Sequence, residues 1–133
     1  MPASTYTANL MAKAFAHGTA YQGPTTVYLA LVTTEPSAGT GGTEVTAAEY
    51  ARFEFNQTTL WDDDDAGTLT SNADVEYPEL TTEDYEDEVV AVEAYDSDVG
   101  GNRLWYIVLL SPRQFVIGET PKFIAGDLVM DFV

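Results

Sequence analysis

The sequence contains no cysteine, so it can form neither a disulfide framework nor a thiolate site. It has a single histidine, His17, which leaves no set of histidine and cysteine ligands for zinc. A Ser-His-Asp system would depend on this one histidine, and the G-x-S-x-G pattern of a nucleophile elbow is missing. We therefore identify no catalytic residues and expect no enzymatic activity and no cofactor.

Basic residues are also scarce, with five Lys and Arg against 22 Asp and Glu and a net charge of −17. A free polyanion of this kind repels nucleic acid and anionic membranes. The acidic residues are spread over most of the chain, and only two of the basic residues are lysines. This pattern is typical of a halophilic surface, because molar salt screens the self-repulsion. The alternative is a moderately acidic mesophilic protein with basic partners.

Long apolar runs are absent as well, since none approaches the roughly 20 residues that span a bilayer. The first 15 residues have neither the basic start nor the long apolar stretch of a secretory signal. We therefore expect synthesis in a cytoplasm and no membrane insertion, with release by a route such as assembly into a particle. The hydrophobic content of 45% is high enough for a core, and the length of 133 residues predicts one domain, residues 1–133.

The first predicted element is a short helix over residues 5–17. Ser4 or Thr5 can cap its start, and Gly18 stands where a helix would stop. His17 lies at the helix end, where a cation complements the helix dipole. The apolar residues at helical spacing are Tyr6, Leu10, Met11, Ala14 and Phe15. A helix this short is marginal alone, so we expect it to cover one face of a sheet.

After Gly23-Pro24 the pattern changes to strands, which continue to residue 133. Residues 25–34 are apolar on both faces, which predicts a central strand covered on both sides. Residues 88–96 and 103–111 flank a turn and predict a hairpin in the middle of a sheet. Further strands are predicted in segments 51–57, 73–80 and the closing stretch from 115, and Pro78 ends the second of these or places it at an edge. One helix followed by many short strands predicts a mainly β protein, an antiparallel, jelly-roll-like β-sandwich.

Four consecutive aspartates, Asp62 to Asp65, are the most conspicuous charged motif. If Gly67 is the sixth position of an EF-hand loop, Asp62 and Asp64 occupy the first and third positions. The fifth and twelfth positions are then Ala66 and Ala73, which offer no carboxylate. We therefore favour a hydrated loop tip between two strands, with a weak Ca²⁺, Mg²⁺ or K⁺ site at Asp62 and Asp64 as the alternative.

Two other sets of residues have ambiguous roles. The acidic run at 81–90 contains paired carboxylates of the kind used in glycoside hydrolysis, but their separation does not follow from sequence. Tyr50, Trp61 and Tyr85 are candidates for an interface with a sugar or a protein, because tyrosine and tryptophan are common interface anchors. The same residue types also occur at the edges of a β-sandwich core.

Several segments together resemble small structural proteins of tailed-virus particles, of the tail-fibre-like or head-decoration-like kind. The longest is FAHGTAYQGPTTVYLALVTTEPSAGTGGTEVTAAEYAR at 15–52. It is followed by SNADVEYP at 71–78, GGNRLWYIVL at 100–109 and GETPKFIAGDLVMDF at 118–132. The resemblance covers most of the chain and rests on the order and spacing of the pieces. It implies a non-enzymatic virion protein with a β-sandwich fold.

The resemblance and the charge together give a specific expectation. The chain would be made in the host cytoplasm and reside in the virion of a haloarchaeal virus, as a homo-oligomer bound to other virion proteins. Our first choice is a symmetric multimer on the capsid surface or vertex, a turret or decoration. The alternative is a tail-fibre or baseplate protein that binds a host-surface glycan or S-layer protein, and an enzyme of a halophile ranks last.

Overall fold

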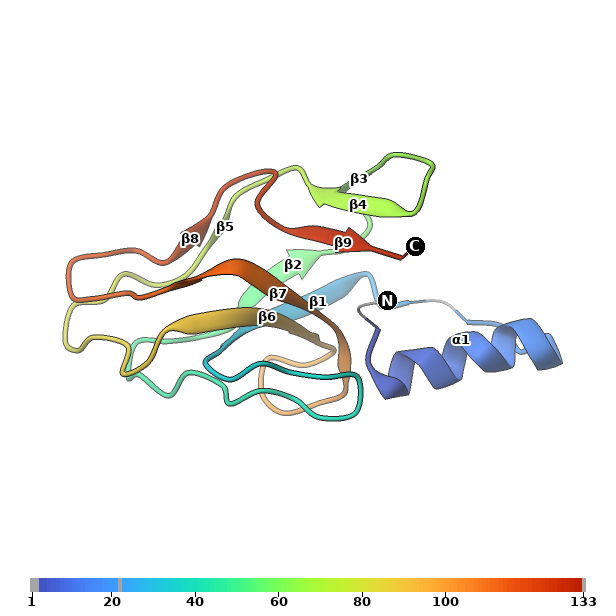
Figure 1. The fold of residues 1–133 in the computed structure, drawn as a ribbon, viewed down its shortest axis with the longest axis horizontal. Helices are drawn as coiled ribbons and strands as arrows, with labels where there is room; N and C mark the ends of the chain where they lie inside the picture. Colours follow the sequence, from blue (N-terminus) through green and yellow to red (C-terminus); the bar gives the residue numbers. More distant parts are fainter. Residues whose placement is uncertain (1–2, 22, 133) are drawn as a thin grey trace.

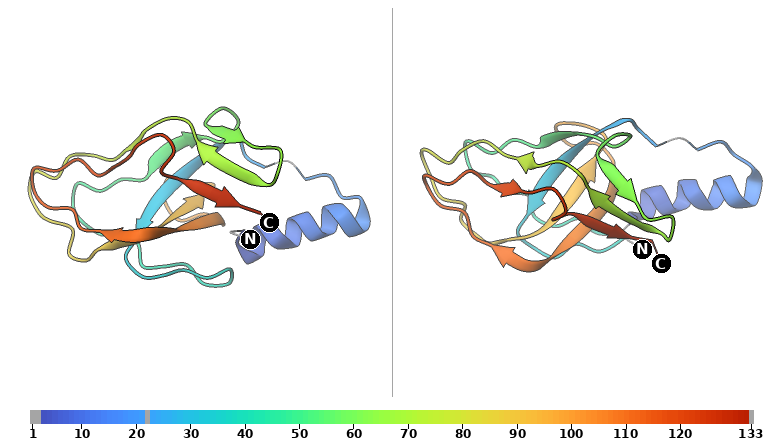
Figure 2. Two further views of the ribbon diagram at one scale, coloured as in Figure 1. Left: turned by 45° about the horizontal axis from the view of Figure 1, so that its top comes forward. Right: turned by 90° about the horizontal axis from the view of Figure 1, so that it is seen from above.

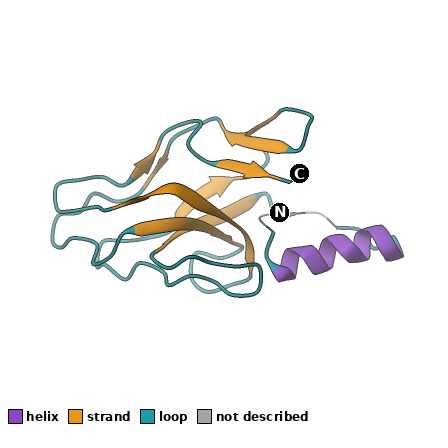
Figure 3. Cartoon of the chain, in the orientation of Figure 1, coloured by secondary structure: helices purple, strands orange, loops and turns teal. Residues whose placement is uncertain are grey.

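The computed structural model describes residues 3–21 and 23–132, which form one helix and nine strands. Figures 1 and 3 show α1 followed by strands only. The elements are α1 (Thr5–His17), β1 (Thr26–Val32), β2 (Phe53–Asn56), β3 (Trp61–Asp63), β4 (Thr68–Ser71), β5 (Val75–Glu76), β6 (Val89–Tyr95), β7 (Arg103–Arg113), β8 (Lys122–Phe123) and β9 (Val129–Asp131). The predicted mainly β class with one short helix is confirmed.

The strands form three antiparallel sheets that enclose the core. A four-stranded sheet has the order β2-β1-β6-β7, and smaller sheets have the orders β3-β4-β9 and β5-β8. The smaller sheets lie over one face of the large sheet, so the strands form a sandwich (Figures 1 and 2). Its largest fully buried apolar side chains are Val27, Leu29, Leu31, Phe55, Val75, Leu80, Tyr85, Val89, Phe123 and Leu128. We call the strands with their connecting loops, residues 23–132, the β body.

Strand β1 is central, as its two-sided apolar pattern predicted. It pairs with β2 on one side and β6 on the other. Leu29 and Leu31 point into the sandwich core, while Ala30 and Val32 lie on the opposite face and are also fully buried. Successive strand residues face opposite sides, so burial of both sets requires a cover on each side of the sheet.

The second face of β1 is covered by the loop that follows it, not by α1. The end of this loop pairs with the edge of β1: the Thr33 N–H donates to the Thr43 carbonyl at 2.8 Å, and the Val45 N–H donates to the Leu31 carbonyl at 3.0 Å. Gly42 lies over the face, so close to β1 that a Cβ there would be 2.9 Å from the Cβ of Val32. The loop therefore folds back onto the strand it leaves, and glycine allows the close approach.

Helix α1 has the predicted bounds and caps but not the predicted place. The Ser4 side chain accepts the Thr7 N–H, and Gly18 has φ 64°, which ends the helix in the left-handed region. Only the first turn is anchored: the Ser4 N–H donates to the Leu104 carbonyl at 3.0 Å. The rest projects from one end of the β body in every view (Figures 1 and 2). The expectation that α1 covers a sheet face is therefore wrong, because the loop after β1 already covers that face.

The predicted hairpin exists but lies at an edge of the sheet. Strands β6 and β7 pair antiparallel, and β7 is the last strand in the order β2-β1-β6-β7. Its first half contributes Leu104, Trp105 and Ile107 to the core, but Leu110 is fully exposed. The expectation that the hairpin lies in the middle of the sheet is therefore wrong for β7. The apolar pattern of β7 continues past the point where the smaller sheets cover it.

Candidate functional site

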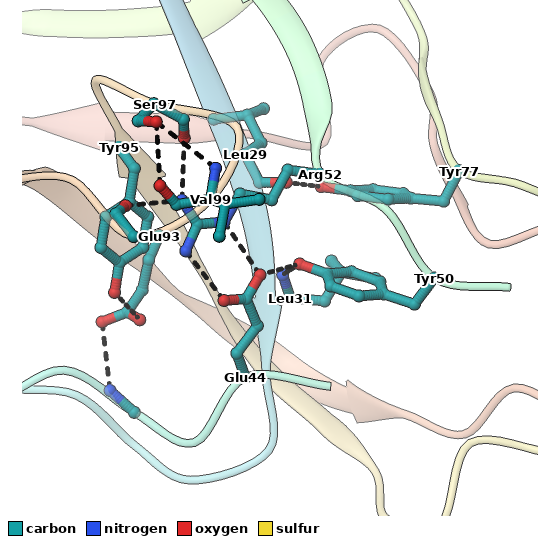
Figure 4. A network of polar contacts seen from close by, with 12 residues as sticks. Leu29, Leu31, Glu44, Tyr50, Arg52, Tyr77, Glu93, Tyr95, Ser97 and Val99 are labelled. Atoms are coloured by element: carbon teal, nitrogen blue, oxygen red, sulfur yellow. Dashed lines mark hydrogen bonds and ion pairs between the residues drawn. The ribbon is translucent and has the colours of Figure 1, made fainter. Parts of the chain in front are cut away.

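A network of charged side chains lies between β6 and the loop after β1 (Figure 4), and we call its residues Glu44, Arg52, Glu93 and Arg103 the charged layer. Glu93 on β6 is completely buried and forms an ion pair with Arg103 on β7 at 3.0 Å. Its carboxylate also accepts the Gly42 N–H at 3.1 Å and the Tyr95 hydroxyl at 3.1 Å. A buried carboxylate is costly unless it is paired and hydrogen-bonded, and all three donors lie close enough to satisfy it.

A second ion pair lies next to the first. Arg52 binds Glu44 through two N–H groups, each 2.9 Å from a carboxylate oxygen, in the bidentate geometry that guanidinium favours. The remaining Arg52 nitrogen donates to the carbonyls of Ser97 and Gly100 at 2.8 Å each. Its guanidinium lies 4.0 Å from the centroid of the Tyr95 ring. Arg52 thus joins the loop between β1 and β2 to the loop between β6 and β7.

Tyr50, an interface candidate from the sequence, takes part in this network. Its hydroxyl donates to Glu44 at 2.6 Å and accepts the Leu31 N–H at 3.1 Å. Burial and the hydrogen bond to Glu44 raise the pKa of the Tyr50 phenol. Burial also acts to raise the pKa of Glu44, but hydrogen bonds from Arg52 and Tyr50 outweigh it, and that pKa is lowered. The pair therefore holds a charged carboxylate and a neutral phenol at neutral pH.

A shallow groove of about 530 Å³ lies on the outer side of this network. Its lining includes Tyr28, Tyr50, Arg52, Glu54 and Val99. Aromatic rings beside carboxylate and guanidinium groups offer both an apolar face and hydrogen-bonding partners. The groove can therefore receive a polar ligand with an apolar side, such as a sugar.

Tyr85, the second interface candidate, lies in the core with 2% of its surface exposed. Its ring packs edge-on against Tyr50 and Phe115, with centroids 6.4 and 5.8 Å apart. Burial and then the charge of Glu49 raise the pKa of Tyr85 to about 12. In this structure the side chain fills the sandwich interior and has no free face for a partner.

Trp61, the third interface candidate, is half-buried at the start of β3. Its ring packs against Phe55 and Trp105, with centroids 5.4 and 5.6 Å apart. The Trp105 indole in turn donates to the Gln57 side chain at 2.6 Å. The three candidate aromatics are therefore not brought together at one surface.

The aspartate run spans the end of β3 and the turn to β4: Asp62 and Asp63 lie in the strand, and Asp64 and Asp65 lie in the predicted loop tip. The Asp64 carboxylate accepts the backbone N–H groups of Thr68 and Ala66 at 3.0 and 2.8 Å, and both bonds lower its pKa. Asp62 accepts the Asn72 side-chain amide at 3.0 Å. Within residues 3–21 and 23–132, no group of three or more His, Asp or Glu has an arrangement suited to a metal ion. The cation site at Asp62 and Asp64 remains a prediction.

Sequence reasoning missed the charged layer and two exposed apolar surfaces. Arg52 and Arg103 are two of only five basic residues, and their rarity was the available signal. The apolar surfaces are the outer half of β7, with Val108 and Leu110, and the free side of α1, where Phe15 is 88% exposed. Amphipathic spacing alone did not show which apolar residues would stay exposed.

The antiparallel β fold, its braced loops and its exposed apolar surfaces are those of a β-sandwich structural module. A family model described as "Podophage GP4 fiber I protein gp80" matches residues 2–131. The chain therefore belongs to this family of virus fibre proteins and is a tail-fibre-like virion protein. Among curated proteins no match was found. In the part of the chain that the structure describes, α1 is too short to cross a membrane.

Proposed function

We propose that this chain is a non-enzymatic subunit of a tail fibre in a virus particle, where it works as a symmetric multimer bound to other virion proteins. The observation that carries this proposal is the family match over residues 2–131. It favours the fibre over the capsid-surface or vertex multimer that was the first choice from the sequence. The chain would act as a single domain, residues 1–133, with no turnover of substrate.

The structure supports a mechanical role through the way it holds its loops. Glu93 and Arg103 tie the loop after β1 to the sheet, and the Glu44–Arg52 pair adds the loop between β6 and β7. A rigid module with exposed apolar surfaces suits assembly, because little conformational entropy is lost when copies dock.

Purified particles give the direct test of this location. Gold-labelled antibody against the chain should decorate fibres in electron micrographs, and label on the capsid vertex would favour the first-choice alternative instead. Absence of the chain from purified particles, checked by mass spectrometry, would refute a virion role. An antibody against the major capsid protein provides the control for particle integrity.

We further propose that the particle infects a haloarchaeal host, because the net charge of −17 suits molar salt. Screening of like charges should raise the melting temperature by at least about 5 °C between low and molar KCl. Sucrose at matched osmolality serves as the control, because it does not screen charge. An equal rise in sucrose, or a flat response to KCl, would remove the halophilic argument.

A second candidate function is binding of a host-surface glycan or S-layer protein. The groove beside Tyr50 favours it, since Tyr28 offers a ring face and the exposed Glu54 carboxylate offers hydrogen-bond acceptors there. The test is a glycan array probed with the wild type and with Tyr28→Ala. Binding lost in the variant would support the candidate, while binding that Tyr28→Ala leaves unchanged would exclude this groove.

A further inference from the structure

The acidic residues of this chain begin only after its first quarter. Residues 1–34 contain no Asp or Glu, and Lys13 gives them a formal charge of +1. Residues 35–133 hold all 22 acidic residues and the other four basic ones, a net charge of −18. The segment that includes α1 is therefore the longest part of the sequence without negative charge.

Helix α1 carries an apolar stripe on its free side, which we call the α1 seam: Ala8, Met11, Ala12 and Phe15. Their spacing of i, i+3, i+4 and i+7 places them on one helix face. Three of them are exposed and Met11 is half-buried. Phe15, near the free end, is 88% exposed, so almost its whole ring contacts water.

The opposite side of α1 faces its own chain across a pocket. Tyr6 and Leu10 line this pocket together with Tyr21 and Pro24 from the segment that returns to β1, and Tyr6 is 44% exposed. Successive residues of a helix are about 100° apart around its axis. This spacing places Lys13 on the side away from the α1 seam. The seam is thus the apolar side of α1 that the β body and the returning segment leave uncovered.

We propose that α1 joins copies of this chain, by packing its seam against the α1 seam of a second copy. This inference rests on the proposed function as an assembling virion subunit and names the surface that assembles. The alanines at positions 8 and 12 let two helix axes approach closely, and Phe15 and Met11 supply the buried area. The same contact stabilises a helix of 13 residues that is marginal alone.

Electrostatics favours a contact between α1 helices over a contact between β bodies. Molar salt screens charges that lie farther apart than about 3 Å, but two β bodies, each carrying most of a charge of −18, would press carboxylates together where their surfaces meet. Because α1 projects from the end of the β body (Figure 1), seam-to-seam packing brings together only acid-free segments. Lys13 stays at the outside of such a helix pair, so no charge is buried.

The outer half of β7 is the competing surface. Val108, Leu110 and Val129 line a groove there, beside Arg113 and Asp127. Strand β7 itself lies in an acid-free stretch, residues 99–118, and Asp127 in the groove pairs with Arg113 at 3.2 Å, so charge alone does not exclude this surface. This surface is the alternative that the experiment must separate from the α1 seam.

Disulfide trapping tests the seam directly, because the wild-type chain has no cysteine. Ala12→Cys places one thiol in the α1 seam, and Lys13→Cys places one on the other side of the same helix. Under mild oxidation of the full chain in molar KCl, Ala12→Cys should form covalent dimers at least about tenfold faster than Lys13→Cys. Equal rates, or dimers only with Lys13→Cys, would overturn the proposal.

Sedimentation equilibrium of two matched variants completes the test. Phe15→Gln and Leu110→Gln each replace an exposed apolar side chain, 88% and 105% exposed, with the same polar one. Phe15→Gln should raise the dissociation constant of the multimer by at least about tenfold, a loss of about 1.4 kcal/mol, and Leu110→Gln should leave it unchanged. The reverse result would assign the contact to β7 and overturn the seam.

Failure of the seam and failure of the proposed function give different results. A chain that multimerises in solution through β7, and is found in particles, refutes the α1 seam but keeps the virion role. A chain that is monomeric at every concentration refutes the seam, and its absence from purified particles refutes the virion role.

Discussion

The β body and α1 place similar aromatic residues in opposite environments. Phe55 in β2 has no exposed surface, whereas Phe15 in α1 is 88% exposed. The β body also satisfies its buried charges, as Glu93 does with Arg103. Aromatic side chains are thus buried in one region and exposed in the other. We infer from this contrast that the two regions have different roles. The β body provides a stable unit, and α1 provides a surface.

The largest predicted effect compares these two phenylalanines. Phe55→Ala should lower the free energy of unfolding by about 3–5 kcal/mol, because it leaves a cavity in the core. Phe15→Ala, measured at a concentration where the chain is monomeric, should change it by less than about 0.5 kcal/mol. Urea denaturation followed by tryptophan fluorescence measures both. Similar losses in the two variants would mean that Phe15 packs on the β body.

The buried ion pair gives the next largest effect. Arg103→Met leaves the Glu93 carboxylate buried without its cation, which should cost about 3–5 kcal/mol. Arg113→Met serves as the control, because its pair with Asp127 is partly exposed and should contribute less than about 1 kcal/mol. A double variant, Glu93→Leu with Arg103→Met, should recover most of the loss. A cost in Arg103→Met no larger than in the control would show that the charged layer does not brace the loop.

A smaller, pH-dependent effect is expected at Glu49. A hydrogen bond from the Thr81 hydroxyl, followed by the N–H groups of Thr82 and Thr81, lowers the pKa of Glu49 from 4.5 to about 2. Because the folded pKa is the lower one, this stabilisation is present above pH 4.5 and is lost as the pH falls towards 2. Glu49→Gln should therefore lose less stability than the wild type across that window.

The control for this pH effect is Glu54→Gln, which replaces an exposed carboxylate on β2. It should follow the wild-type curve of stability against pH between 4.5 and 2. If Glu49→Gln and Glu54→Gln give the same curve, the hydrogen bonds to Thr81 and Thr82 do not stabilise the fold.

The smallest effect is expected for the aspartate turn. Replacing Asp62 to Asp65 with asparagine should leave the fold intact at low salt or slightly more stable, because four like charges are removed. The turn should keep its hydrogen bonds, since the amide oxygen of an asparagine side chain can still accept the N–H groups of Ala66 and Thr68. Circular dichroism with and without Ca²⁺ measures the change. Severe unfolding with loss of a bound divalent ion would instead establish the cation site.

Local elements of this fold followed from sequence because their causes are local. Ser4 and Gly18 set the bounds of α1 through short-range hydrogen bonding and a left-handed backbone. The two-sided apolar pattern of residues 25–34 correctly predicted a central strand, and Pro78 correctly ended the strand that begins at Val75. These features depend on residues next to one another in the chain.

The arrangement of those elements depended on contacts that sequence spacing does not encode. The loop after β1 covers the sheet because Gly42 approaches Val32 and donates to Glu93, which lies 51 residues further on. Once that face is filled, α1 has no sheet to cover. Tyr85 was ambiguous for the same reason, since only the packed core shows that its ring meets Phe115.

Hydrogen–deuterium exchange at two protein concentrations tests the division between β body and α1 most directly. In dilute monomer, the amides of residues 5–17 should exchange quickly, and those of β6 should be protected. At a concentration where multimers form in molar KCl, residues 5–17 should become protected while β6 stays unchanged. Protection that appears at β7 instead, with residues 5–17 exchanging equally fast at both concentrations, would contradict the account.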